Sequence, residues 1–321
     1  MATPRRAASP RQTRQTENAK RLTALAENIA NATCTPFLGS GASAPQIPTG
    51  GGLAADWARR FRYPFADTGN LARVMQYVAF TQYSGDEFLL KQRLIREHFH
   101  NPPEPDFDAP YQVHKVLAEC SLPLYVTTNY DDFMFRALER RPDRQPLQDI
   151  SPWYVSDSRD AQPSPLGPRS RYRPSASEPL VFHLHGHHSL PASLVLTEND
   201  NIEYLIRHAG DARPTGRPPV LPPYVRGRLR DTSLLFLGYS VTDWTFHVLF
   251  RRLLYGAPSK RNHVSVQIDP TLVGAKQACR FVEQYLSSLN IWIFWDSTES
   301  FMRKLVTRLR VVRRTRGGGR P

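Results

Sequence analysis

The stretch Phe37-Leu38-Gly39-Ser40-Gly41-Ala42-Ser43-Ala44-Pro45 is a short apolar strand that runs directly into a loop of small residues. Gly39 and Gly41 would let backbone amides approach a phosphate closely, and Ser40 and Ser43 would add hydroxyl donors. The loop lacks the third glycine of the common dinucleotide-binding fingerprint, so an ordinary strand-to-helix turn is the alternative interpretation. Three later segments favour phosphate binding.

Apolar strand-like segments alternate with helix-like segments along the rest of the chain. Helices are predicted at 17–33, at 53–61 after the flexible run Gly50-Gly51-Gly52, and at 70–100, 110–120, 133–138, 244–255 and 298–309. A further helix is predicted after the strand at 264–269 and ends at Leu286. Further strands are predicted at 122–126, 180–184, 193–196, 233–237, 264–269 and 291–296. This alternation predicts an α/β fold, a doubly wound, Rossmann-like and mostly parallel sheet with helices on both faces.

The 321 residues are expected to form one domain over 17–310, with a small helical insertion at about 70–120 and mobile loops at about 157–178 and 207–223. Residues 1–16 are predicted to be a disordered basic tail and residues 311–321 a second basic tail. No apolar run reaches the roughly 18 residues of a membrane span. The first residues also lack the apolar region of a secretory signal, so a cytoplasmic protein is expected.

The net charge of +13 is concentrated at the two ends of the chain. Residues 1–16 carry four arginines and residues 301–321 carry eight basic residues, in both cases without an acidic residue, so the other 284 residues carry only +1. Nucleic acid is therefore expected to bind only through these basic ends, or through a partner, and solvated ends are the alternative. The three cysteines lie far apart, which argues against a zinc module or a disulfide framework.

Three predicted strands are followed by polar or glycine-containing loops, as the strand at residue 37 is. Thr128-Asn129-Tyr130-Asp131 follows the strand at 122–126, His185-Gly186 follows 180–184, and Gly238-Tyr239-Ser240 follows 233–237. In an α/β sheet such loops lie at the carboxyl ends of the strands, where ligands bind.

The order of these four loops resembles the sirtuin family, and specifically its divergent bacterial branch in anti-phage defence. The loop at 39–43 is similar to the sirtuin Gly-Ala-Gly-x-Ser phosphate loop, with Ser40 in place of alanine. Asn129 and Asp131 match the Asn and Asp of a Gln-Asn-x-Asp motif, and Thr128 stands where glutamine is usual.

The remaining loops extend the resemblance to roughly residues 30–300. His185 matches the catalytic histidine of the sirtuin His-Gly motif, and Gly238 and Ser240 match a Gly-Thr-Ser loop. Asp269 stands where sirtuins usually place an asparagine beside the adenine ribose. The resemblance implies that Gly39, Ser40, Gly41, Ser43, Thr128, Gly238, Ser240 and Asp269 contact NAD+, and that Asn129, His185 and Asp131 are catalytic.

The departures from the family pattern concern the acyl-lysine groove. Sirtuin deacylases carry a four-cysteine zinc module shortly after the His-Gly motif, but here only residues 187–192 separate that motif from the next predicted strand, and no cysteine is near. Relatives with such departures are implied to hydrolyse NAD+ outright. No metal is expected, and NAD+ is expected as the substrate.

Side-chain chemistry agrees with this implication. Cleavage of the nicotinamide bond builds positive charge on the ribose, so the pocket must hold the sugar and admit one positioned nucleophile. Asn129 offers an amide to orient a water or a ribose hydroxyl, Asp131 is expected to orient the nicotinamide amide or the loop, and His185 suits general-base work. The structural alternatives are turn formation for Asn129 and Asp131 and a satisfied strand-end position for His185. His183, His187 and His188 are expected to be structural.

The leading interpretation is an NAD+ hydrolase that acts as the effector of an anti-phage system. The resemblance implies activation through homo-oligomerisation or through a second defence protein, either a translocase-type ATPase or an Argonaute-like sensor. A non-catalytic sensor of NAD+ or of an ADP-ribose-type nucleotide is the main alternative, followed by a protein deacylase and by a nucleic-acid-binding protein.

Overall fold

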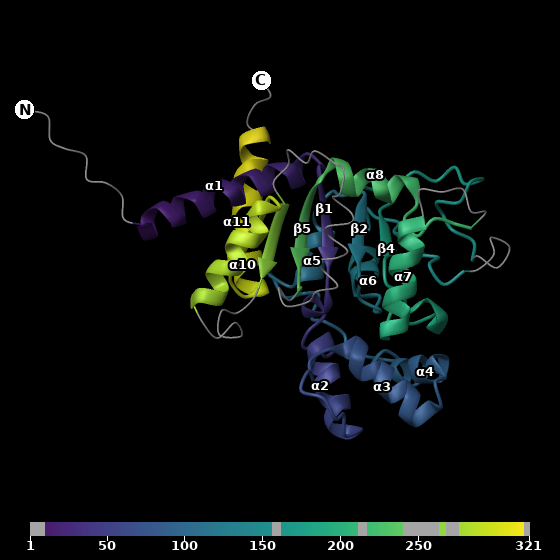
Figure 1. The fold of residues 1–321 in the computed structure, drawn as a ribbon. Coiled ribbons are helices and arrows are strands. Elements are labelled where there is room, and N and C mark those ends of the chain that lie inside the picture. Colours follow the sequence, from purple (N-terminus) through teal and green to yellow (C-terminus); the bar gives the residue numbers. More distant parts are fainter. Residues whose placement is uncertain (1–9, 156–161, 211–216, 240–262, 268–275, 318–321) are drawn as a thin grey trace, which may run out of the picture.

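The computed structural model describes residues 10–155, 162–210, 217–239, 263–267 and 276–317 (Figure 1). Its centre is a sheet of seven strands in the order β3-β4-β2-β1-β5-β6-β7, and every pair of neighbours is parallel. The strands are β1 (Cys34–Leu38), β2 (Leu124–Thr127), β3 (Leu147–Ile150), β4 (Leu180–His183), β5 (Ser233–Leu237), β6 (His263–Gln267) and β7 (Ile291–Trp295). The predicted parallel α/β class is confirmed.

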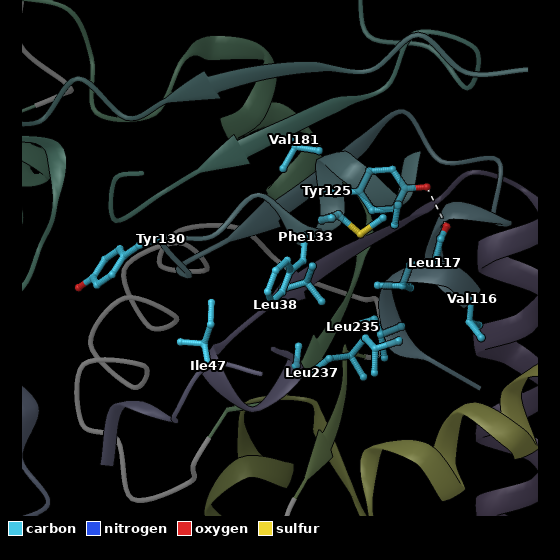
Figure 2. Packing of buried hydrophobic residues seen from close by; sticks show 14 of the residues in the cluster. Leu38, Ile47, Val116, Leu117, Tyr125, Tyr130, Phe133, Val181, Leu235 and Leu237 are labelled. Carbon is cyan, nitrogen blue, oxygen red and sulfur yellow. Dashed lines mark hydrogen bonds between the residues drawn. The ribbon is translucent and has the colours of Figure 1, made fainter. Parts of the chain in front are cut away.

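Helices cover both faces of the sheet, so β1, β2, β4 and β5 are buried along their whole length. One face packs against α1 (Pro10–Ala30), α5 (Val113–Ala118), α6 (Phe133–Glu139) and α11 (Thr298–Gly317). The other packs against α7 (Glu198–Gly210), α8 (Pro223–Asp231) and α10 (Lys276–Ser288). Figure 2 shows the first of these cores, in which the Tyr125 hydroxyl donates to the Leu117 carbonyl over 3.0 Å.

The chain passes from β1 to β2 on one side of β1 and later enters β5 on its other side. The loops after β1 and β5 therefore leave the sheet next to each other at a topological switch point. In open α/β sheets, ligands bind in the crevice at such a point. Leu38 at the end of β1 pairs with Leu237 of β5 and Thr127 of β2, which places all three loops together.

A helical insertion lies beyond the carboxyl ends of the strands (Figure 1). It contains α2 (Gly50–Arg60), α3 (Leu71–Tyr83) and α4 (Glu87–His98). The Thr49 hydroxyl accepts from the Gly52 amide, so the three glycines predicted to be flexible form the first turn of α2. The helix predicted at 70–100 is two helices, because Ser84 and Gly85 adopt positive φ values of 52° and 86° and Asp86 caps α4.

Other predicted elements also differ from the structure. Residues 193–196 form no strand; Pro191–Ser193 is a single 3-10 turn. The strand β3 and the helix α8 were not predicted, since β3 has little apolar sequence and α8 begins within a proline-rich segment, where Pro223 fits a first helical turn. The predicted helix at 244–255 lies outside the described residues.

Both predicted tails overlap helices. The helix α1 begins at Pro10 and α11 continues to Gly317, so residues 10–16 and 311–317 are helical. The two helices pack side by side, and Val312 extends the buried apolar face of α11 past the predicted boundary. Among the described helices, none is both long and apolar enough to cross a membrane.

Candidate functional site

The loop after β1 packs directly against the loop after β5, and glycines make this approach feasible. Gly238 has a φ of +74°, and a Cβ atom there would lie 2.2 Å from the Ala42 nitrogen. A Cβ on Gly39 would lie 2.9 Å from the Gly238 oxygen, and one on Gly41 would lie 2.9 Å from its Cα. These three glycines are therefore required by close packing of the two loops.

The backbone amides of the β1 loop are mostly engaged within the protein. Gly39 N donates to Leu237 O, Gly41 N to Gly238 O, Ala42 N to Gly39 O and Ser43 N to Ser40 O, over 2.8 to 3.2 Å. This differs from the predicted phosphate cradle, which needs amides that point outward. The Ser40 hydroxyl accepts from Gly50 N over 3.2 Å, so its own proton remains available to a ligand.

A buried hydrogen-bond network joins the ends of β1 and β2. Asn129 Nδ2 donates to Gly39 O over 3.0 Å and to Ser43 Oγ over 2.9 Å, and Ser43 Oγ donates to Asp131 Oδ2 over 2.7 Å. Four predicted site residues are thus brought together. Both amide protons of Asn129 are used, which leaves Oδ1 as the group that can accept from a water or a ribose hydroxyl.

Asp131 holds this network in place. Its second oxygen accepts from the Phe133 amide in the first turn of α6 over 3.1 Å. Burial raises the pKa of the Asp131 carboxyl to about 6, and the hydrogen bonds from Ser43 and Phe133 oppose that rise. Its oxygens face Ser43 and the first turn of α6, which ties the β1 loop to the β2 loop; the roles predicted for Asp131 towards NAD+ stay predictions.

Tyr239 completes the same edge and was not predicted as a site residue. Its hydroxyl donates to Leu38 O over 2.9 Å and lies 2.7 Å from the Thr128 hydroxyl. Thr128, which stands at the glutamine position of the sirtuin motif, is therefore tied to the β5 loop. The signal in the sequence was the position of Tyr239 between Gly238 and Ser240.

His185 follows β4 and takes no part in the Asn129 network. Its ring is half-buried against the Tyr204 ring, with centroids 5.2 Å apart, and its Nε2 is enclosed without a hydrogen-bond partner among the described residues. Burial lowers the pKa of His185 to about 4, so the imidazole is neutral at pH 7.

Gly186 fixes the path of the chain after His185. Its φ is +95°, and a Cβ atom there would lie 2.1 Å from Ser193 O. Trp153 Nε1 donates to the same Ser193 oxygen over 2.6 Å, and Val195 N donates to His185 O over 2.9 Å. The residues predicted as a strand therefore serve as the support of the His185 loop.

Three further histidines form a row beside this loop. The ring centroids of His183 and His187 are 4.5 Å apart, and those of His187 and His188 are 4.2 Å apart. Burial lowers the pKa of His183 to about 4 and that of His187 to about 2. The Nε2 atoms of both are buried and find no hydrogen-bond partner in the described part of the chain. That part also contains no group of three or more His, Cys, Asp or Glu side chains that would suit a metal ion.

A buried ion pair connects the helical insertion to the support of the His185 loop. Lys91 Nζ of α4 lies 2.5 Å from Asp200 Oδ1 of α7, and both side chains are at most 7% exposed. Asp200 Oδ2 accepts from the Leu196 and Thr197 amides, and Lys91 Nζ lies 5.6 Å from the Trp153 ring centroid. In the sequence, the capping-box pattern from Thr197 to Asp200 was a signal for the position of Asp200, but no pattern indicated its pairing with Lys91.

Two predicted contact residues, Ser240 and Asp269, lie outside the described residues. The other predicted residues divide into a connected group at the ends of β1, β2 and β5 and a separate position at the end of β4. No hydrogen bond between described residues joins His185 to Asn129 or Asp131.

A parallel doubly wound sheet with polar loops at its switch point defines this chain as a Rossmann-type α/β domain. The chain belongs to the SIR2-like domain family, because the model of that family matches residues 123–289, just over half of the 321 residues. Membership of this family supports an NAD-related function of the sirtuin type.

The chain is also similar to a solved structure described as "Structural Basis for the Mechanism and Regulation of Sir2 Enzymes". The two are 14% identical, with a TM-score of 0.39 over 92% of this chain and 99% of that chain. No curated protein matches the sequence.

Proposed function

We propose that this protein hydrolyses NAD+ to nicotinamide and ADP-ribose. The observation that carries the proposal is that the carboxyl edge of one sheet holds two separate groups, a rigid Asn129 amide after β2 and a neutral His185 after β4. Asn129 is held through both amide protons, and its Oδ1 stays available to orient a hydroxyl or a water. The role proposed for His185 is to remove the proton from the attacking group.

The neutral state of His185 suits a general base, because only the unprotonated ring can accept a proton. Its lowered pKa makes it a weak base in the free protein. Burial is the cause of that lowered pKa, so any bound group that solvates or hydrogen-bonds the ring would raise it towards the working pH. In this proposal, substrate binding itself adjusts the basicity of His185.

The proposal also assigns the binding of the phosphates. The Ser40 hydroxyl donates its proton to no acceptor among the described residues, whereas the amides of Gly39, Gly41, Ala42 and Ser43 are engaged. Hydroxyl contacts from Ser40 would then replace much of the amide cradle. The tight contact between the β1 and β5 loops supports this assignment, because it leaves the backbone little freedom to turn outward.

The direct test is incubation of the purified protein with NAD+ and chromatographic measurement of nicotinamide and ADP-ribose. His185→Ala should reduce the rate by about 10²-fold or more, the usual value of a general base. His100→Ala, which alters an exposed histidine, should keep the wild-type rate. Retention of more than a tenth of the rate by His185→Ala would remove this residue as the base.

A non-catalytic NAD+ sensor is the second candidate, and the network around Asn129 favours it. Every predicted donor in that network already has a partner within the protein, as expected of a rigid binding site. Calorimetric binding of NAD+ without release of nicotinamide, with and without candidate partners, would support the sensor.

We further propose that the protein acts in the cytoplasm as an anti-phage effector, activated by oligomerisation or by a translocase-type ATPase or an Argonaute-like protein. The resemblance to the defence branch supports this role. Bacteria that express the chain with its neighbouring genes should lose NAD+ upon infection, and His185→Ala should abolish the loss.

A further inference from the structure

The last helix, α11, carries a basic surface on the side that faces away from the core. Its apolar side is buried against the sheet and α1 through Phe301, Met302, Leu305, Leu309 and Val312. Arg303, Lys304, Arg310, Arg313 and Arg314 are exposed on the remaining sides, and no acidic residue follows Glu299 in the chain. The basic end of the protein is therefore displayed on an ordered helix.

Some of these cations already have partners within the protein, two of them acidic side chains and one a backbone carbonyl. Arg303 pairs with Glu299, Lys304 contacts Asp296, and Arg313 donates to the Glu119 carbonyl. Arg310 and Arg314 differ, because neither has an acidic partner within the described residues. They lie one helical turn apart, and like charges at that spacing destabilise an isolated helix. If α11 served only to cover the sheet, this pair of like charges would not stabilise it.

The unpaired arginines lie far from the candidate site. β7 ends at the same edge of the sheet as the site, and α11 then runs back towards the amino ends of the strands (Figure 1). Arg310 and Arg314 are near the carboxyl end of this helix and thus towards the opposite edge. They also lie outside residues 123–289, which match the SIR2-like family.

We propose that α11 binds the phosphate backbone of nucleic acid through Arg310 and Arg314. Two arginines whose backbone positions are about 6 Å apart along the helix axis, from a rise of ~1.5 Å per residue, can reach neighbouring phosphates on one strand. Arginine is also suited to bidentate contact with phosphate. A surface for a protein partner would instead need an apolar centre, and Val311 is the one large exposed hydrophobic residue among the described residues of this helix.

The test is fluorescence anisotropy of the full-length protein with a labelled 20-base-pair DNA duplex, and with single-stranded DNA and RNA of equal length, between 50 and 200 mM salt. For the wild type, the logarithm of the affinity should fall linearly with the logarithm of the salt concentration, through counterion release. Arg310→Gln/Arg314→Gln should weaken duplex binding at least ~10-fold and reduce the salt slope by about 2, at roughly 0.9 per phosphate contact.

Arg169→Gln/Arg171→Gln is the matched control, since it removes the same charge from two exposed arginines in a loop beside α8. This control should bind within about twofold of the wild type. An equal loss in both double variants would overturn the proposal in favour of net charge alone. Binding that does not depend on salt, or displacement of the duplex by an equal charge of polyglutamate, would also overturn it. Arg310→Gln/Arg314→Gln should leave NAD+ hydrolysis unchanged, so the outcome is independent of the proposed activity.

Discussion

The two ends of the candidate site differ in how their polar groups are satisfied. At the ends of β1 and β2, Asn129, Ser43 and Asp131 form a closed set of hydrogen bonds of 2.7 to 3.0 Å. At the end of β4, His183, His185 and His187 each bury an Nε2 that has no partner among the described residues. A closed network makes a site rigid, whereas buried polar atoms without partners are costly and are expected where a ligand or water completes them.

The difference assigns separate roles to the two ends. The Asn129 end holds its side chains in a fixed arrangement. The His185 end retains ring nitrogens that can still bind a ligand or accept a proton. The His185 end is accordingly held from outside, through Trp153, Ser193 and the ion pair between Lys91 and Asp200. The following predictions test whether the two ends behave as differently as their hydrogen bonds indicate.

The largest effect is expected from the external support of the His185 end. Lys91→Met leaves Asp200 as a buried charge without its cation, which should lower the free energy of unfolding by about 3–5 kcal/mol. Lys304→Met, which removes an exposed ion pair, should change it by no more than about 1 kcal/mol. Urea denaturation of both variants measures the two losses of stability. Equal losses would show that the buried pair contributes no more to stability than the exposed pair.

A smaller loss of stability is expected from a substitution at the Asn129 end. Asn129→Ala leaves Gly39 O and Ser43 Oγ without their donor, which should lower the free energy of unfolding by about 1–3 kcal/mol. NAD+ should still bind while turnover falls by orders of magnitude, if the amide oxygen orients the reacting group. Calorimetric binding beside single-turnover hydrolysis separates the two roles. Preserved turnover in this variant would contradict the proposed mechanism.

The smallest effect is a difference in pH dependence between the two ends. Asp131 has a folded pKa of about 6, raised from 3.8, so its contribution to stability is present at low pH and is lost as the pH rises through this range. His183 has a folded pKa of about 4, lowered from 6.5, so its contribution is lost as the pH falls from 6.5 to 4. The two ends therefore oppose each other between pH 4 and 6.

Asp131→Asn should steepen the loss of stability on acidification, because it removes the opposing contribution. His183→Gln should make the loss shallower. Thermal unfolding at pH 4.5, 5.5 and 7 measures both slopes. The same sign of change in both variants would mean that the two ends are not electrostatically distinct.

Local patterns in the sequence predicted the parallel sheet and the loops at its edge. Short continuous apolar runs between helix-like segments identified β1, β2, β4 and β5, since strands that are buried on both faces need such runs. The pattern failed for β3 and α8, where few apolar residues or several prolines concealed the element. It also predicted a strand at 193–196, because a buried extended segment resembles a strand until its hydrogen-bond partners are known.

The sequence by itself determined which residues reach the carboxyl edge of the sheet, because the end of each strand and the positions of the glycines are local properties. Only the tertiary structure decided how those residues are paired. Asn129 meets Ser43 across 86 positions of sequence, and Lys91 meets Asp200 across 109. Folding chooses such partners by burial, which gives both amide protons of Asn129 an acceptor and leaves the Nε2 of His185 without a partner among the described residues. No local pattern contains that choice, because the free energy of each buried polar group depends on neighbours that are distant in the chain.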